Sequence, residues 1–117
     1  MKKLNWIKLT RFGNDTHHYS GIYKISSYVF NSRLKTEDRL KGVPRYYQVY
    51  ILADNNWGDY VDRAKQETTM MTLEEAQALA QTHHNEKGEP DPSRLKTAQA
   101  AIDRWMEPHI QWEKLHG

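Results

Sequence analysis

The chain has 117 residues, of which 38% are hydrophobic and 27% charged, and its formal net charge is +2. This length predicts one domain, residues 1–117, because two halves would each be too short for a core of their own, and the composition is not that of a disordered protein. The absence of cysteine excludes disulfides and cysteine-based metal sites, and no apolar run approaches the length that spans a bilayer.

Charge is distributed unevenly along the chain. Residues 1–50 hold ten Lys and Arg against three Asp and Glu, whereas residues 51–117 hold seven against twelve. Such an imbalance is typical of a protein that meets a polyanion, but the two halves can also screen each other in the fold or pair between subunits. No apolar run follows Met1-Lys2-Lys3, so we expect a cytoplasmic protein that is neither secreted nor membrane-spanning.

The first part of the chain predicts two strands separated by a turn. Residues 6–9 are typical of a short edge strand, and the polar residues 13–18 predict a turn. Residues 22–30 are rich in β-branched and aromatic residues, which predicts a strand. On its buried face we expect Tyr23, Ile25 and Val29.

A long basic connection precedes the strongest strand pattern of the chain. Residues 31–44 are basic and end in Gly42-Val43-Pro44, which stops any helix. Residues 46–52 then predict a strand, and a turn at 54–56 returns the chain as a partner strand over 57–61. On one face of the first of these strands we expect Tyr47, Val49 and Ile51.

Two helices are expected in the second half. Thr72 and Glu75 form a capping box, so a helix is predicted from Leu73 to about residue 85. The residues on the side that faces the sheet are Leu73, Ala76, Leu79, Ala80 and His83.

A C-terminal helix is predicted over 91–115, with Asp91 as N-cap and Pro92 at its first position. Its apolar seam consists of Leu95, Ala98, Ile102 and Trp105, and Trp112 continues the seam if Pro108 only kinks the helix. A homodimer through this helix is one interpretation of the seam, with Trp105 in the core and Trp112 exposed.

The expected fold is therefore α+β: a small antiparallel sheet of three or four strands packed by one helix, with an additional C-terminal helix. Residues 1–66 supply mainly the strands and the basic loop, and residues 72–85 and 91–115 supply the helices.

The sequence gives little indication of a catalytic site or a metal site. His83 and His84 are neighbours on a predicted helix and so point about 100° apart. Neither this pair nor His17-His18 has a carboxylate at a familiar metal-ligand spacing. The acidic candidates Asp54, Asp59, Asp62, Glu74 and Glu75 all fall at turns, edges or a helix start. No phosphate loop or nucleophile motif is present, so we expect no enzyme activity, no metal and no cofactor.

Binding residues are easier to nominate. The basic residues 33–45 beside Tyr46 and Tyr47 have the composition of a loop that contacts phosphates while rings stack on bases, but a charged loop can serve solubility alone. Tryptophan is common in interface hot spots. The residues expected to contact a partner are Tyr46, Tyr50, Trp57 and Trp112 by apolar contact and Arg33, Lys35, Arg39, Lys41 and Arg45 by charge.

The order of elements resembles that of small phage accessory proteins. The resemblance covers about residues 20–84: the strand Gly21-Ile22-Tyr23-Lys24-Ile25, a hairpin returning at Trp57-Gly58, and a helix opening Thr72-Leu73-Glu74-Glu75-Ala76. Some proteins of this kind inhibit host defences, and anti-CRISPR proteins are among them. The resemblance brings no catalytic residues.

A second similarity is to the arm-binding domains of phage integrases, in which a three-stranded sheet backed by one helix enters DNA. The helix start at residues 72–76 fits that pattern. Those domains carry Lys and Arg along their strands, whereas residues 47–51 carry none and the return strand carries Asp59 and Asp62. This difference argues against DNA binding by the sheet.

The sequence thus favours a non-enzymatic phage or mobile-element protein that occupies a surface of a protein partner, such as a host defence complex. The alternative is a nucleic-acid-binding accessory protein that uses the basic 33–45 loop.

Overall fold

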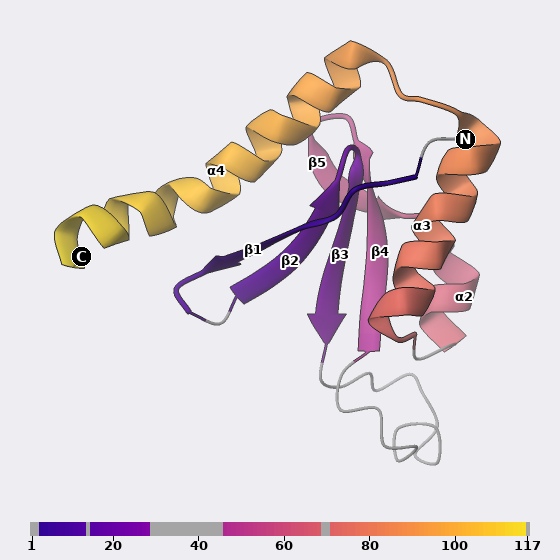
Figure 1. The fold of residues 1–117 in the computed structure, drawn as a ribbon, viewed down its shortest axis with the longest axis horizontal. Coiled ribbons are helices and arrows are strands. Elements are labelled where there is room, and N and C mark those ends of the chain that lie inside the picture. The colour runs from indigo at the N-terminus through magenta and orange to yellow at the C-terminus, as the bar shows by residue number, and fades with distance from the viewer. Residues whose placement is uncertain (1–2, 14, 29–45, 69–70, 117) are drawn as a thin grey trace.

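The computed structural model describes residues 3–13, 15–28, 46–68 and 71–116 and has an α+β fold. One antiparallel sheet contains five strands in the order β1-β2-β3-β4-β5. The elements are β1 (Ile7–Arg11), β2 (Asp15–Ser20), β3 (Tyr23–Tyr28), β4 (Tyr46–Ala53), β5 (Asn56–Tyr60), α2 (Arg63–Thr68), α3 (Leu73–Lys87) and α4 (Pro92–His116) (Figure 1). The predicted class is confirmed, with five strands rather than three or four.

The additional strand is β2, and the prediction of a turn over residues 13–18 is wrong. Left-handed backbone is found at Phe12 and Gly13, whose φ angles are 53° and 80°, so the turn lies at the tip of the β1–β2 hairpin. Beyond it the polar residues pair in register with β1, and the hydroxyls of Thr10 and Thr16 hydrogen-bond across the pair at 2.8 Å. A polar segment forms a strand here because its side chains find polar partners.

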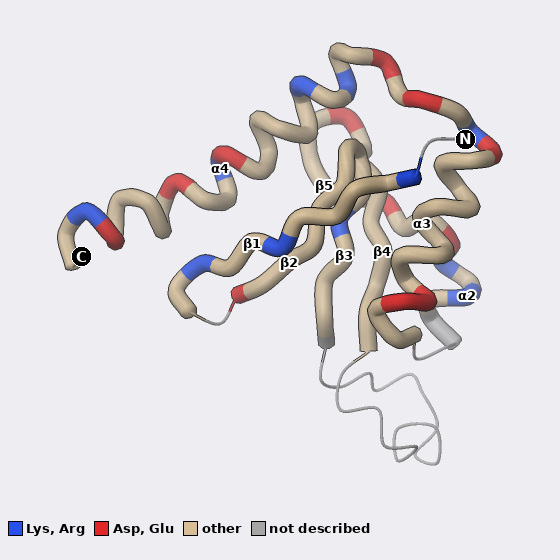
Figure 2. Tube along the Cα trace, viewed as in Figure 1, with Lys and Arg blue, Asp and Glu red and all other residues tan. Residues whose placement is uncertain are grey.

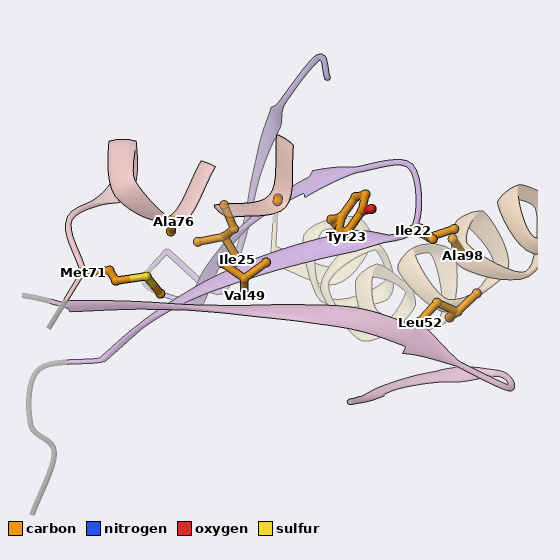
Figure 3. Packing of buried hydrophobic residues seen from close by; sticks show 9 residues of the cluster. Ile22, Tyr23, Ile25, Val49, Leu52, Met71, Ala76 and Ala98 are labelled. Carbon is orange, nitrogen blue, oxygen red and sulfur yellow. The ribbon is translucent and has the colours of Figure 1, made fainter. Parts of the chain in front are cut away.

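The face of the sheet toward α3 holds the main hydrophobic core. Ile25 of β3 and Val49 of β4 are fully buried, and they lie beside Met71 and Ala76 (Figure 3). The alanines of α3 allow its backbone to approach the strands closely. Residues expected on the buried strand faces are placed there: Tyr23, Ile25 and Val49 are buried and Tyr47 and Ile51 partly buried, while Val29 lies outside the described residues.

The start of α3 is the predicted capping box. The Thr72 hydroxyl accepts the Glu75 N–H at 3.2 Å, and a Glu75 carboxylate oxygen accepts the Thr72 N–H at 3.1 Å. Of the predicted inner side, Ala76 and Ala80 are buried. The helix ends two residues later than expected, at Lys87, where Gly88 with a φ of 80° follows.

The first half of α4 packs on the opposite face of the sheet. Ser20 pairs with Tyr23, whose side chain belongs to the core beneath α3, so the neighbouring Tyr19 points the other way. The Tyr19 ring is 1% exposed and lies 5.9 Å from the ring of Trp105. The predicted seam is confirmed at Ala98 and Ile102, which are buried, whereas Leu95 is 39% exposed.

A short helix that the sequence did not predict, α2, is tied to the sheet by one side chain. Gln66 is 0% exposed, and its amide accepts the Val49 N–H and donates to the Val49 carbonyl at 3.1 Å. This side chain therefore acts as a one-residue strand partner for β4.

Candidate functional site

The basic segment falls outside the described residues. The predicted contact residues of this segment, which the structure does not describe, are Arg33, Lys35, Arg39, Lys41 and Arg45. In the described part of the chain, Figure 2 shows both signs of charge along α4 and acidic residues along the connection between α3 and α4. In the basic N-terminal half, Arg11 forms an ion pair with Asp15. Both residues belong to that half, so this pair does not join the two oppositely charged halves.

Two of the predicted aromatic contact residues are packed into the fold. Tyr46 is 3% exposed. Trp57 is half-buried against Tyr19, with ring centroids 5.7 Å apart, and its Nε1 is buried without a hydrogen-bond partner in the described structure. Their roles in binding remain predictions, but both rings already contribute to the packing of the protein itself.

Tyr50 lies on the sheet face opposite α3, in a group of tyrosines and cations. Its ring is 4.9 Å from that of Tyr60, and the Lys24 ammonium lies 5.1 Å from the Tyr50 centroid. The Arg63 guanidinium lies 5.0 Å from the Tyr60 centroid. Burial lowers the pKa of Lys24, and the nearby Asp15 opposes that shift. Both tyrosines are partly buried, and rings beside cations are the arrangement on which bases stack.

Trp112 belongs to a group of four rings at the far end of α4. Phe12 at the hairpin tip makes edge contacts with His109 at 5.5 Å and with Trp112 at 6.0 Å. Trp112 in turn stacks on His109 at 6.1 Å and on His116 at 4.9 Å. We call Phe12, His109, Trp112 and His116 the ring stack. Figure 1 shows that this end of α4 extends past the sheet.

Two rings of the ring stack, those of Phe12 and Trp112, are exposed, whereas the His109 side chain is 12% exposed. Other apolar side chains follow on the same turns of the helix. Phe12 is 43% exposed and Trp112 45%. Ile110 is 40% exposed and Leu115 82%. Trp112 and Leu115, three positions apart, share one side of the helix, whereas Ile110 lies on the other side. Exposed large apolar side chains that share a side mark an interaction surface more often than single exposed residues do. The expected exposure of Trp112 is confirmed.

Arg11 fastens the hairpin to α4. Its Nε donates to Asp15 at 2.7 Å, and its Nη1 donates to the Trp105 carbonyl at 2.8 Å. The guanidinium also lies 4.8 Å from the centroid of the Trp105 ring. One side chain thus links β1, β2 and α4 at the base of the ring stack.

His109 completes this attachment and has a defined tautomer. Its Nδ1 accepts the Phe12 N–H at 3.0 Å, so Nδ1 carries no proton. The proton is therefore on Nε2, which lies 2.9 Å from a carboxylate oxygen of Glu113. The positive φ of Phe12 is unusual for a residue with a side chain, and strain of this kind concentrates at functional sites.

The histidine pairs do not converge on a metal site. His17 bonds to the Ser26 hydroxyl through Nδ1 at 2.7 Å, and burial, with the nearby Lys24, lowers its pKa to about 4. His83 bonds to the Tyr23 hydroxyl at 2.7 Å, whereas its neighbour His84 is buried with Nδ1 unpartnered. Among the described residues no three His, Asp or Glu side chains are grouped to hold a metal ion.

Two of the acidic candidates have structural partners. Asp62 accepts the Lys65 N–H at 3.0 Å at the start of α2, and Glu75 belongs to the capping box. Neither contact places a carboxylate beside a second catalytic group.

Comparison with protein-family models, curated proteins and solved structures finds no match to this chain. None of the helices in the described ranges is both long and apolar enough to cross a membrane. The candidate site therefore depends on the geometry of the chain itself.

Most of the ring stack was missed by sequence reasoning, although part of it had a signal. Trp105, His109, Trp112 and His116 follow one another at three- and four-residue spacing, so continuing the predicted seam with histidines included would have found them. Phe12 had no such signal, because its contact with His109 joins residues 97 apart.

Proposed function

We propose that this chain is a non-enzymatic binding protein that acts by occupying a surface of a protein partner. Its loose resemblance to small phage accessory proteins favours a phage or mobile-element origin and a host defence complex as the partner, in the manner of anti-CRISPR proteins. The site of action is then the cytoplasm of the host.

The observation that carries this proposal is the exposed ring stack with its apolar flank. Trp112 and Leu115 are 45% and 82% exposed on a helix end that extends past the sheet. Tryptophan in such a position is the usual anchor of a protein–protein hot spot, since burying it removes a large apolar area from water. Arg11 and His109 hold the neighbouring rings in place, which lowers the entropy cost of binding.

The carboxylate beside the ring stack favours a protein over a nucleic acid at this end. Glu113 lies four positions after His109 on the same side of α4, its side chain is 61% exposed, and it would repel phosphates. A partner with an apolar pocket and a basic rim suits these residues.

The inner side of α4 is occupied by the protein's own sheet. Ala98 and Ile102 are buried, so the middle of the seam through which a homodimer is possible is covered, whereas Leu95 at its start is 39% exposed. A homodimer through α4 remains a prediction. A measured mass in solution equal to that of one chain would contradict it.

Nucleic-acid binding is the second candidate function, and the tyrosines and cations on the sheet face opposite α3 favour it. Lys24 over Tyr50 and Arg63 over Tyr60 combine charge with stackable rings. In this alternative the basic 33–45 segment, which joins β3 to β4, supplies further phosphate contacts.

An affinity pulldown from bacterial lysate, with and without nuclease, separates the two functions. The proposal predicts that a protein complex stays bound after nuclease treatment, is identified by mass spectrometry, and binds again when purified. Recovery of nuclease-sensitive material alone would favour the alternative. In that case Arg39→Glu with Lys41→Glu should abolish binding that has a steep salt dependence.

A further inference from the structure

A cavity of about 400 Å³ lies at the beginning of α4, at the opposite end of that helix from the ring stack. Its apolar lining comes from the ends of two central strands and the turn between β2 and β3, with Ile22, Tyr23 and Ile51. Its polar lining includes His83 and Lys87 of α3 and Arg94 of α4. This volume falls within the range of small-molecule sites.

A hydrogen bond joins the Tyr23 hydroxyl to the His83 ring, and both residues line the cavity. Burial raises the pKa of the Tyr23 hydroxyl to about 12, so the phenol keeps its proton at neutral pH. The hydroxyl lies 2.7 Å from Nδ1 of His83, within hydrogen-bond distance. Burial, with the cations Lys87 and Arg94 nearby, lowers the pKa of His83, so the imidazole is neutral at neutral pH.

Arg94 adds donors whose position is fixed. Its Nη2 donates to the Leu52 carbonyl at 2.7 Å, which holds the guanidinium at the end of β4. A guanidinium has five N–H donors, so others remain that can bind a ligand. Lys87 adds a second cation from the last turn of α3.

Two carboxylates, those of Glu89 and Asp91, also line the cavity. One oxygen of Glu89 lies 3.3 Å from Nε2 of the buried His84, so that oxygen already has a partner on another side chain. Lys87 and Arg94 both lower the pKa of His83, and Glu86 raises it. The lining of the cavity thus holds two cations that act on His83, together with the two carboxylates.

We propose that this cavity binds a small ligand that carries an oxyanion, a carboxylate or a phosphate, on an apolar body. The oxyanion binds among the Arg94 guanidinium, the Lys87 ammonium and the His83 ring, and the apolar body lies against Ile22 and Ile51. This site is independent of the proposed function, because none of its residues belongs to the ring stack.

NMR titration of the full chain tests the site with four probes: phenyl phosphate, benzoate, inorganic phosphate and benzylamine. We expect saturable shifts of the Gly88 amide and the His83 ring nitrogens with phenyl phosphate and benzoate. Inorganic phosphate should bind more weakly because it lacks the apolar body, and benzylamine should cause no shift because it is a cation. Shifts confined to other residues, or none with the two aromatic anions, would overturn the proposal.

A matched pair of arginine variants locates the binding. Arg104 is also on α4 and also donates to a backbone carbonyl, that of Asn55 at 3.0 Å, but it does not line the cavity. Arg94→Gln should weaken binding of phenyl phosphate about tenfold, the effect of one charge-assisted hydrogen bond, and Arg104→Gln should leave it unchanged. Equal affinities in the two variants would contradict the site.

Lys87→Gln provides a second variant if Arg94→Gln does not fold. Lys87 is exposed, so the fold does not depend on its burial. We expect about threefold weaker binding, the modest effect of an exposed charge. Unchanged affinity in this variant would place the oxyanion elsewhere.

Discussion

The two long helices cover the sheet in different ways. α3 buries Ala76 and Ala80 directly against the central strands. Only the first half of α4 is buried in this way, and its second half is held at a distance by the long side chain of Arg11 and by the ring of Phe12. Small side chains at the contact bring a helix and a sheet together, whereas long ones leave a surface open. We therefore expect α3 to contribute mainly to the stability of the fold and the end of α4 to present exposed side chains to a partner.

The largest expected effect is a loss of stability, and two isoleucines, one on each face of the sheet, allow the faces to be compared. Ile25→Ala, beneath α3, should cost about 4 kcal/mol of unfolding free energy, and Ile102→Ala, on α4, about 2 kcal/mol. Ile25 is 0% exposed among close neighbours, whereas Ile102 borders a cavity of about 220 Å³ that reduces its contacts. Urea unfolding measures both. Equal losses would contradict the difference between the faces.

A smaller effect concerns the pH dependence of the face toward α4. His17 is neutral in the folded protein because burial, with Lys24 nearby, lowers its pKa to about 4, while in the unfolded chain it titrates near 6.5. The unfolded state therefore binds more protons between these values, and stability falls as pH falls from 6.5 to 4. Because the ring is partly exposed, we expect a loss of about 1–2 kcal/mol over this range.

His17→Gln tests this assignment, since it removes the titrating ring and keeps the strand. Urea unfolding at pH 7 and pH 4 should show about 1–2 kcal/mol less pH dependence in the variant than in the wild type. A variant with the wild-type pH dependence would show that other groups are responsible.

The smallest effect on stability is expected at the hairpin tip. Phe12→Gly removes the ring contacts but also relieves a residue with a φ of 53°, so the unfolding free energy should change by less than about 1 kcal/mol. The end of α4 should nevertheless become mobile. Amide relaxation measures this as a fall of the order parameters of residues 109–116 from about 0.85 to below about 0.6.

Gly13→Ala is the control at the same tip. A Cβ at this position meets nothing within 4 Å, but the φ of 80° disfavours it. We expect a loss of about 1 kcal/mol without any change in the mobility of α4. If Phe12→Gly leaves the order parameters at their wild-type values, the ring of Phe12 does not hold the helix end.

Local patterns predicted much of this fold, and distant contacts limited the rest. The start of α3 followed from Thr72 and Glu75, three residues apart, and the central strands followed from alternation over 46–52. β2 was missed because Asp15–His18 is polar, and its partners Thr10 and Ser26 come from other strands. The sequence predicted Trp112 as a contact residue but gave no signal for Phe12, because Phe12 contacts α4 only when the hairpin has folded.

Trp112→Ala combined with Leu115→Ser tests the central claim most directly, in the nuclease-treated pulldown. Ile7→Ser is the control, because Ile7 is 52% exposed on β1 and outside the ring stack. We predict that the double variant folds as the wild type does and no longer retains the protein partner, while the control retains it. Undiminished retention by the double variant would contradict the assignment of the binding surface to the end of α4.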